Sequence, residues 1–249
     1  MWVTSPRPRT DHLQRVYPSG YHRLRLADVP RDWSGPRRGM LLDVGCGVGD
    51  GLSLARAQGW ECTGIEISKE AAAIARERGF HVIAGDATDD VYPEQEFDRV
   101  QCWHTLEHVH DPGLLLRRLR DAVKADGCIS LVLPNRRSLM SSIFRGYWYH
   151  LDVPRHLHHF GPDDVRVLAA ANGLLVTSVR HTASPSGLLG SIDIVVTRLL
   201  GRDPRLRSRI RLRSSARALT WPIARIHLAD VVEYELVAEP GGRPIRAAR

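Results

Sequence analysis

One segment constrains the fold more than any other, an apolar strand that runs directly into a glycine-rich turn at residues 41–50 (LLDVGCGVGD). Glycine lets the main chain approach a ligand closely, and the N–H groups of the helix that follows can bind it. The dinucleotide-binding fingerprint needs a glycine at the sixth position of this turn. Counted from Gly45 the sixth residue is Asp50, and counted from Gly47 it is Leu52, so that fingerprint fails. The sequence therefore predicts a ligand-binding strand, loop and helix of another kind.

Further apolar segments alternate with helical patterns along the chain. The other strands are predicted over residues 61–68, 80–84, 97–102, 127–133, 174–179 and 231–237. Ser68 is predicted to cap the helix at 69–78, and Asp111 and Pro112 to open an amphipathic helix with arginines 117, 118 and 120 on its solvent side. Strands that alternate with helices indicate a parallel sheet with both faces covered.

Acidic residues follow the second and third strands, at Glu66 and Asp86, and the sequence WHTLEH (103–108) follows the fourth. Together with the glycine loop, this order and spacing resembles the class I S-adenosylmethionine-dependent methyltransferases. The later block YHLDVPRH (149–156) is similar to the bacterial branch that methylates small molecules such as sugars, lipid precursors and antibiotic intermediates. The resemblance implies an α/β, Rossmann-like sheet of seven strands, mostly parallel with an antiparallel last strand, with helices on both faces.

The resemblance also implies S-adenosylmethionine as the cofactor and assigns positions to it. Glu66 falls at the ribose, where a carboxylate can accept hydrogen bonds from both hydroxyls. The cofactor-binding residues implied in this way are Asp43, Gly45 and Gly47 around the methionine moiety, Glu66 and Ile67 at the ribose, Asp86 and Ala87 at the adenine, and His104 after the fourth strand.

Methyl transfer from a sulfonium requires an aligned nucleophile and, for a hydroxyl, removal of its proton. Histidine is the natural base because its ordinary pKa is about 6.5. We predict His156 as the base, since Asp152 and Arg155 lie nearby in the sequence, with His104 as the alternative. The competing interpretations are that His156 only pins its loop and that His104 only lines the cofactor. An amine acceptor would need positioning alone.

Residues 104–108 (HTLEH) also spell the inverted zinc-protease pattern. Here the pattern follows a strand of a nucleotide-binding sheet and has no evident third ligand. The cluster of His156, His158 and His159 could also bind a divalent metal, but the adjacent His158 and His159 point in different directions in either a strand or a helix. No two of the four cysteines have the C-x-x-C spacing of a zinc or redox site. The sequence therefore predicts no metal.

Three regions are expected along the chain of 249 residues. Residues 1–38 form an N-terminal arm or lid, residues 39–183 and 230–240 form the cofactor-binding core, and residues 184–229 form a helical insertion that caps the acceptor site. The insertion has helical apolar spacing, then an arginine run, then a second apolar helix around 219–228. A first, histidine-rich insertion at about 135–160 is expected to form one wall of the acceptor pocket.

The net charge of +7 is concentrated between residues 198 and 217, which hold eight arginines and one acid, Asp203. Such a run suits an acidic or phosphorylated acceptor, a peripheral membrane contact or a solvated helix face, and the insertion also offers a homodimer contact. The Asn/Asp-Pro-Pro-aromatic signature of amino-group DNA methyltransferases is replaced by WHTL (103–106), which disfavours nucleic acid.

The sequence thus predicts an enzyme that methylates a small-molecule acceptor, most simply at a hydroxyl. Its rivals are an RNA or protein methyltransferase and a non-catalytic module that only binds the cofactor. No secretion-like N-terminal segment and no apolar run of membrane-spanning length occurs, and unpaired thiols suit a reducing compartment. A cytoplasmic location is therefore expected.

Overall fold

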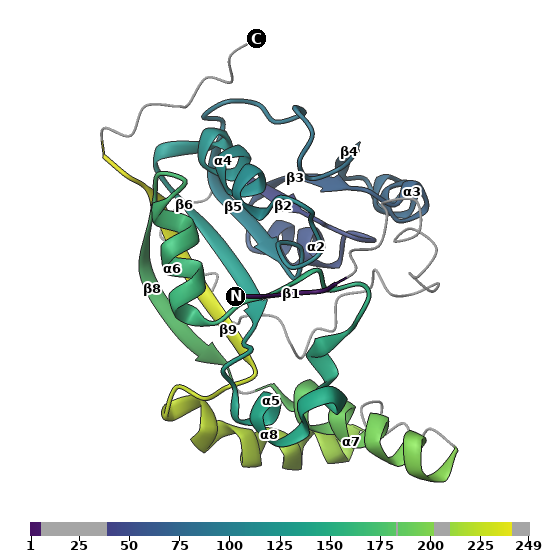
Figure 1. Ribbon diagram of the computed structural model, residues 1–249. Coiled ribbons are helices and arrows are strands. Elements are labelled where there is room, and N and C mark those ends of the chain that lie inside the picture. The colour runs from purple at the N-terminus through teal and green to yellow at the C-terminus, as the bar shows by residue number, and fades with distance from the viewer. Residues whose placement is uncertain (6–38, 183, 202–209, 241–249) are drawn as a thin grey trace.

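The structure is a computed structural model, and it describes residues 1–5, 39–182, 184–201 and 210–240 (Figure 1). The strands are β1 Trp2–Val3, β2 Met40–Val44, β3 Glu61–Glu66, β4 His81–Ala84, β5 Phe97–Trp103, β6 Val123–Pro134, β7 His158–His159, β8 Leu174–Thr182 and β9 Val231–Ala238. The α-helices are α2 Asp50–Ala57, α3 Lys69–Glu77, α4 Pro112–Ala122, α5 Leu139–Phe144, α6 Pro162–Ala170, α7 Pro185–Leu200 and α8 Ile210–Arg225. Two 3₁₀ turns, η2 Arg145–Tyr147 and η3 Tyr149–Leu151, lie between α5 and β7.

The main sheet has seven strands in the order β4-β3-β2-β5-β6-β9-β8. Strands β2 to β6 pair in parallel, and β9 is antiparallel to both of its neighbours, β6 and β8. The predicted fold, a seven-stranded sheet with an antiparallel last strand, is therefore confirmed. The carboxyl ends of β2, β3, β4 and β5 meet at one edge of the sheet, which is where an open α/β sheet binds its ligand.

Helices cover both faces of this sheet. Adjacent residues of β2 point to opposite faces, so Leu41 packs with Leu52 of α2 and Ala72 of α3, whereas Leu42 packs with Leu115 of α4 and Val165 of α6. All six side chains are fully buried. The two apolar layers fix the strand edge from which the loops of the site emerge.

Most helix starts follow the sequence signals. The Ser68 side chain accepts a hydrogen bond from the Ala71 N–H, and the Asp111 side chain accepts one from the Leu114 N–H. The prediction that Arg120 faces solvent is wrong. Its guanidinium is buried because it bonds the Asp121 carboxylate and the Asn172 carbonyl, which compensates the charge.

The insertion before β9 forms two helices, α7 and α8, which lie together at the bottom of the molecule as drawn in Figure 1. Helix α8 begins at Ile210 and ends at Arg225, earlier at both ends than the 219–228 expected from apolar spacing. No helix among the described residues is long and apolar enough to cross a membrane. Most of the predicted arm, residues 6–38, lies outside the described residues. Its first residues pair with the histidine-rich insertion, β1 running antiparallel to β7.

Candidate active site

The glycine loop after β2 forms a tight cradle at the carboxyl edge of the sheet. Gly45, Gly47 and Gly49 all have positive φ, between 56° and 83°, a conformation that other residues rarely adopt. A Cβ at Gly45 would lie 2.2 Å from the Thr105 hydroxyl, which itself donates to the Val44 carbonyl. Thr105, which sequence reasoning did not assign to the site, therefore packs the loop after β5 against the glycine loop.

Glu66 at the end of β3 is aimed into this cradle. One carboxylate oxygen accepts from the Gly47 N–H and the other from the Ser68 N–H, both at 2.8 Å, and the residue is 4% exposed. A carboxylate has about four acceptor positions, so both oxygens retain capacity for ribose hydroxyls. These contacts fit the ribose role that the resemblance implied for Glu66.

Asp43 lies beneath the cradle. A Cβ at Gly51, in the first turn of α2, would lie 2.7 Å from its carboxylate, so only glycine leaves room for the acid at the start of this helix. Burial raises the pKa of Asp43 to about 7, although the amide of Gln101 lowers it in part. Gly51 and Gln101 were not predicted as site residues. The only signal that could have indicated their role is that they lie beside Asp43, on elements that neighbour β2, namely α2 and β5.

The two residues expected at the adenine, Asp86 and Ala87, lie after β4. Asp86 accepts from both the N–H and the hydroxyl of Thr88, which fixes its carboxylate, and the Ala87 carbonyl accepts from Tyr92. Ile67, directly after Glu66, is 42% exposed and offers an apolar surface at the same edge. Their assignment to the cofactor stays a prediction.

His104 and Glu107 form a pair in the loop after β5. His104 has a positive φ of 52°, and its Nδ1 lies 3.2 Å from Oε1 of Glu107. The His104 side chain is 30% exposed, whereas that of Glu107 is 1% exposed. Burial alone would raise the pKa of Glu107, but the hydrogen bond and charge of His104, with His108 and His156 close by, bring that pKa to about 2. Glu107 is therefore an ionised, buried carboxylate that orients an accessible imidazole.

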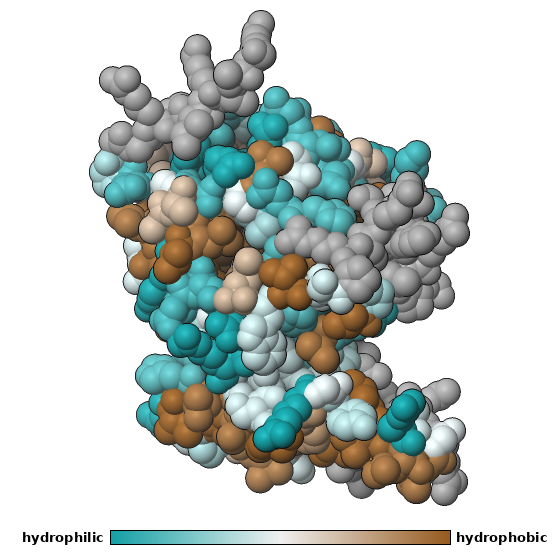
Figure 2. Space-filling view, viewed as in Figure 1, coloured by the Kyte–Doolittle hydropathy of each residue, from teal (hydrophilic) through white to brown (hydrophobic). Residues whose placement is uncertain are grey.

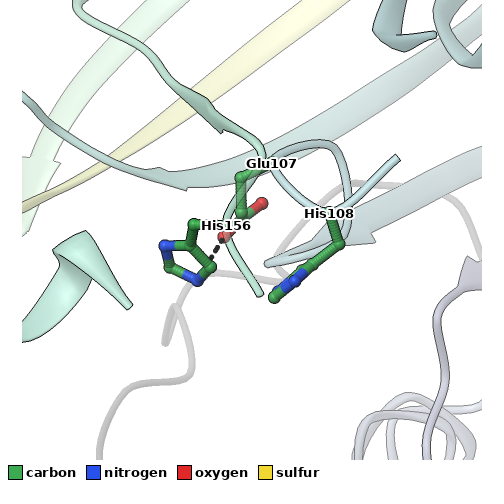
Figure 3. A group of neighbouring side chains, drawn as sticks. All are labelled: Glu107, His108 and His156. Carbon is green, nitrogen blue, oxygen red and sulfur yellow. Dashed lines mark ion pairs between the residues drawn. The ribbon is translucent and has the colours of Figure 1, made fainter. Parts of the chain in front are cut away.

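His156 lies beside the Glu107 carboxylate, across from His108, as Figure 3 shows. Its Nδ1 bonds the His150 carbonyl at 2.8 Å, and its Nε2 lies 3.9 Å from Glu107 and 3.8 Å from Asp152. Burial, aided by His108, lowers the pKa of His156 to about 3 and also lowers that of His108. His156 is thus buried and neutral, while the base role predicted for it stays a prediction.

The histidine-rich insertion is attached directly to this loop. The N–H groups of Leu157 and His158 both donate to the Glu107 carbonyl. Earlier in the same insertion, the ring of His150 stacks on that of His104, with the ring centroids 6.3 Å apart. Residues 145–157, named here the acceptor wall, therefore stand beside His104, at the edge of the sheet where the cofactor loops also lie.

Comparison with known proteins decides the family of this site. The family model described as a methyltransferase domain matches residues 10–179, which is more than half of the chain. The chain belongs to this family. It is an S-adenosylmethionine-dependent methyltransferase, as the glycine cradle and Glu66 had indicated.

Curated relatives include both oxygen and nitrogen methyltransferases. Ubiquinone biosynthesis O-methyltransferases from Hydrogenovibrio crunogenus and Pseudomonas fluorescens are 31% and 32% identical over 151 and 167 residues, covering 55% and 59% of this chain and 62% and 71% of theirs. The ajmaline N-methyltransferase of Rauvolfia serpentina is 35% identical over 119 residues, covering 44% of this chain and 40% of its own. The chain thus spans about two thirds of the length of the ubiquinone enzymes.

Solved structures show the same fold at low sequence identity. A methyltransferase from Thermotoga maritima has a TM-score of 0.55 at 17% identity, covering 81% of this chain and 82% of its own. Phosphoethanolamine N-methyltransferase 2 of Haemonchus contortus, in complex with S-adenosylmethionine, has a TM-score of 0.57 at 20% identity, covering 82% and 50%. These similarities show the Rossmann-like fold.

Proposed function

We propose that the enzyme methylates a hydroxyl group of a small-molecule acceptor and that His104 is the general base. The observation that carries this proposal is the pairing of His104 with the buried Glu107 at 3.2 Å. A hydroxyl acceptor needs a base, whereas an amine needs only positioning. The similarity to O-methyltransferases of ubiquinone biosynthesis supports the same chemistry.

When bound, S-adenosylmethionine supplies a methyl group activated by its positive sulfur. Since a carboxylate can only accept, the Nδ1–H of His104 donates to Glu107, and Nε2 is the basic nitrogen. His104 takes the hydroxyl proton as the acceptor oxygen attacks the methyl carbon, and the electrons of the broken C–S bond stay on sulfur. The negative charge of Glu107 then stabilises the imidazolium. His156 is less suited to this step because it is buried and Nδ1 is engaged with a carbonyl.

A panel of acceptors tests this proposal. The purified enzyme is incubated with S-adenosylmethionine carrying a labelled methyl group and with phenols, sugars, and their amine analogues of the same skeleton. We expect label on hydroxyl acceptors and loss of that label in His104→Gln. Label on the amine analogues alone, unaffected by His104→Gln, would show that the acceptor atom is nitrogen and that no base is needed.

We also infer that the α7–α8 insertion brings the enzyme to an anionic lipid surface. Five large apolar side chains on these helices or directly after α8 are more than half exposed: Leu199, Leu200, Leu219, Trp221 and Ile226. Figure 2 shows this apolar strip along the lower edge of the molecule, over α8 and α7. Exposed Arg198 and Arg225 border it, and Arg225 lies over the Trp221 ring at 4.6 Å. Exposed apolar side chains together with tryptophan and arginine are typical of helices that bind at a membrane interface.

This docking surface is carried in part by α7, which also contacts the acceptor wall. The Tyr149 N–H donates to the Ser191 hydroxyl of α7, and the indole N–H of Trp148 donates to Asp230 at the end of the insertion. An acceptor that enters from the lipid surface would therefore meet the wall that stands beside His104. Acidic or phosphorylated acceptors fit the same arginine-rich insertion, and a homodimer contact is the competing use of its apolar strip.

A further inference from the structure

We propose that Glu107, His108 and His156 bind a divalent transition-metal ion, which fastens the acceptor wall to the loop that carries His104. This inference goes beyond the proposed function, because it concerns how the site is held together and does not depend on the acceptor. The sequence alone predicted no metal, since the HTLEH pattern had no visible third ligand. The fold supplies that ligand, His156, from the acceptor wall.

The three side chains already lie at near-ligand separations. One ligand atom from each falls within 4.8 Å of the others, and Figure 3 shows the two imidazoles on either side of the carboxylate. Atoms bound to one tetrahedral metal ion at about 2.1 Å lie about 3.4 Å apart, so the ligand atoms would have to approach one another by up to about 1.4 Å. Side-chain rotation alone can supply such a movement.

The histidines are held in the tautomer that a metal needs. A carbonyl can only accept a hydrogen bond, so Nδ1 of His156 carries the proton that binds the His150 carbonyl, and Nδ1 of His108 carries the one that binds the Arg155 carbonyl at 3.0 Å. The lone pair of each ring is then on Nε2. Backbone carbonyls orient metal-binding histidines in this way in many proteins.

The burial of Glu107 also favours a cation at this point. Its side chain is 1% exposed, and its Oε2 has no hydrogen-bond partner among the described residues. A buried carboxylate oxygen without a partner is costly. A divalent ion at this point would neutralise the carboxylate and use both imidazole lone pairs.

The donor set selects the class of ion. Two imidazoles and one carboxylate suit zinc and its first-row neighbours, whereas magnesium and calcium prefer oxygen ligands alone. Two ligands come from the loop after β5 and the third from the acceptor wall, so the ion links segments that are otherwise joined here by the hydrogen bonds to the Glu107 carbonyl. Removal of the ion should therefore loosen the wall while the glycine cradle stays intact.

Metal analysis of the full-length protein tests the site. We expect one equivalent of zinc, cobalt or manganese to remain bound after dialysis, and the melting temperature to rise by about 5 °C or more on metal addition. Glu107→Gln and His156→Gln should each abolish both effects. The matched control is His159→Gln, on β7. The ring of His159 lies 6.2 Å from that of His156, but its Nε2 bonds the Leu151 carbonyl and it is no member of the cluster, so this variant should retain the ion. A wild-type protein that retains no ion of the three, or variants that retain as much as wild type, would overturn the site.

Cobalt and His104→Gln separate this inference from the proposed function. Cobalt bound to the cluster should give visible absorption that disappears in His156→Gln and persists in His104→Gln. If His104→Gln retains the cobalt spectrum but still methylates hydroxyls at the wild-type rate, the base assignment fails and the metal site stands. If no variant changes the cobalt spectrum, the ion lies elsewhere and the metal site fails, whatever the turnover.

Discussion

Glu107 is a negative charge at a position where water hardly reaches, and its neighbours explain why it stays ionised. His104, which is 30% exposed, contacts one of its oxygens, and the partly exposed His108 and the buried His156 lie close to it. Glu107 therefore lies between His104, an accessible imidazole that can exchange a proton, and His156, a buried imidazole that cannot. The assignment of roles among the histidines follows from this difference in exposure.

The first residue-scale prediction concerns His104. His104→Gln should lower kcat by roughly 10²–10⁴-fold, the usual contribution of a general base, because no other imidazole of the loop is both exposed and oriented by a carboxylate. The affinity for S-adenosylhomocysteine should change by less than about tenfold. Steady-state kinetics and calorimetry check the two parts. A loss of affinity with unchanged kcat would mean that His104 only lines the cofactor site.

The second concerns the pH dependence of stability. His156 has a folded-state pKa of about 3 against about 6.5 when unfolded, so its contribution is complete above pH 6.5 and is lost as the pH falls toward 3. We expect the free energy of unfolding to fall by about 2 kcal/mol between pH 7 and pH 5 from this group alone. In urea titrations at several pH values in EDTA, the free energy of unfolding of His156→Gln should fall less between pH 7 and pH 5 than that of wild type. An equal fall in the two proteins would mean that His156 is not buried as a neutral ring.

At the scale of elements, α7 is positioned by a close approach to Asp230. A Cβ at Gly187 would fall 1.3 Å from the Asp230 carboxylate, which also accepts from Trp148 and Ser138. The loop that leads into β9 therefore positions both the insertion and the acceptor wall. Neither is needed to form the glycine cradle, because the cradle depends on β2, β3 and β5.

This arrangement predicts that a change at α7 lowers turnover without changing the affinity for the cofactor product. Gly187→Ala should push α7 away from Asp230 and lower turnover by at least about tenfold, since small displacements of a substrate-binding wall cost as much as 10²-fold. Its affinity for S-adenosylhomocysteine should match that of wild type. The control is Gly146→Ala, on the acceptor wall, where a Cβ would meet nothing within 4 Å. Equal turnover in the two variants would show that α7 is not part of the acceptor site.

The elements themselves were largely predictable from the sequence, for reasons that are local. Glycine punctuation and apolar runs predict β2, β3, β5 and the glycine loop, because each is encoded within a few residues. Helix α8 was misplaced because arginines interrupt the apolar spacing near its start at Ile210. Glu107 and Gln101 were not assigned to the site, since their partners come from other segments and no spacing along the chain encodes such contacts.

At the scale of the whole molecule, the exposed apolar strip of α7 and α8 predicts binding to anionic vesicles. We expect the protein to sediment with phosphatidylglycerol-containing vesicles, less with neutral ones, and less as salt rises. Leu219→Glu combined with Trp221→Glu should abolish this binding. Val167→Glu, at an equally exposed position on α6, should not.

Two outcomes would contradict the proposal that the apolar strip binds a lipid surface. Vesicle binding that survives the double substitution would place the contact elsewhere on the molecule. Absence of vesicle binding, together with a dimer in sedimentation that the double substitution dissociates, would show that the strip joins two copies of the chain.

The most direct test of the account is calorimetric titration with S-adenosylhomocysteine. Wild type should bind one equivalent. Glu66→Ala should lose at least about 100-fold in affinity, because each hydrogen bond to the charged carboxylate contributes roughly 1.5–3 kcal/mol and the Gly47 N–H loses its acceptor. Glu66→Gln should fall between the two, since it keeps one acceptor oxygen. Wild-type affinity in Glu66→Ala would place the ribose elsewhere and contradict the cradle on which the site is built.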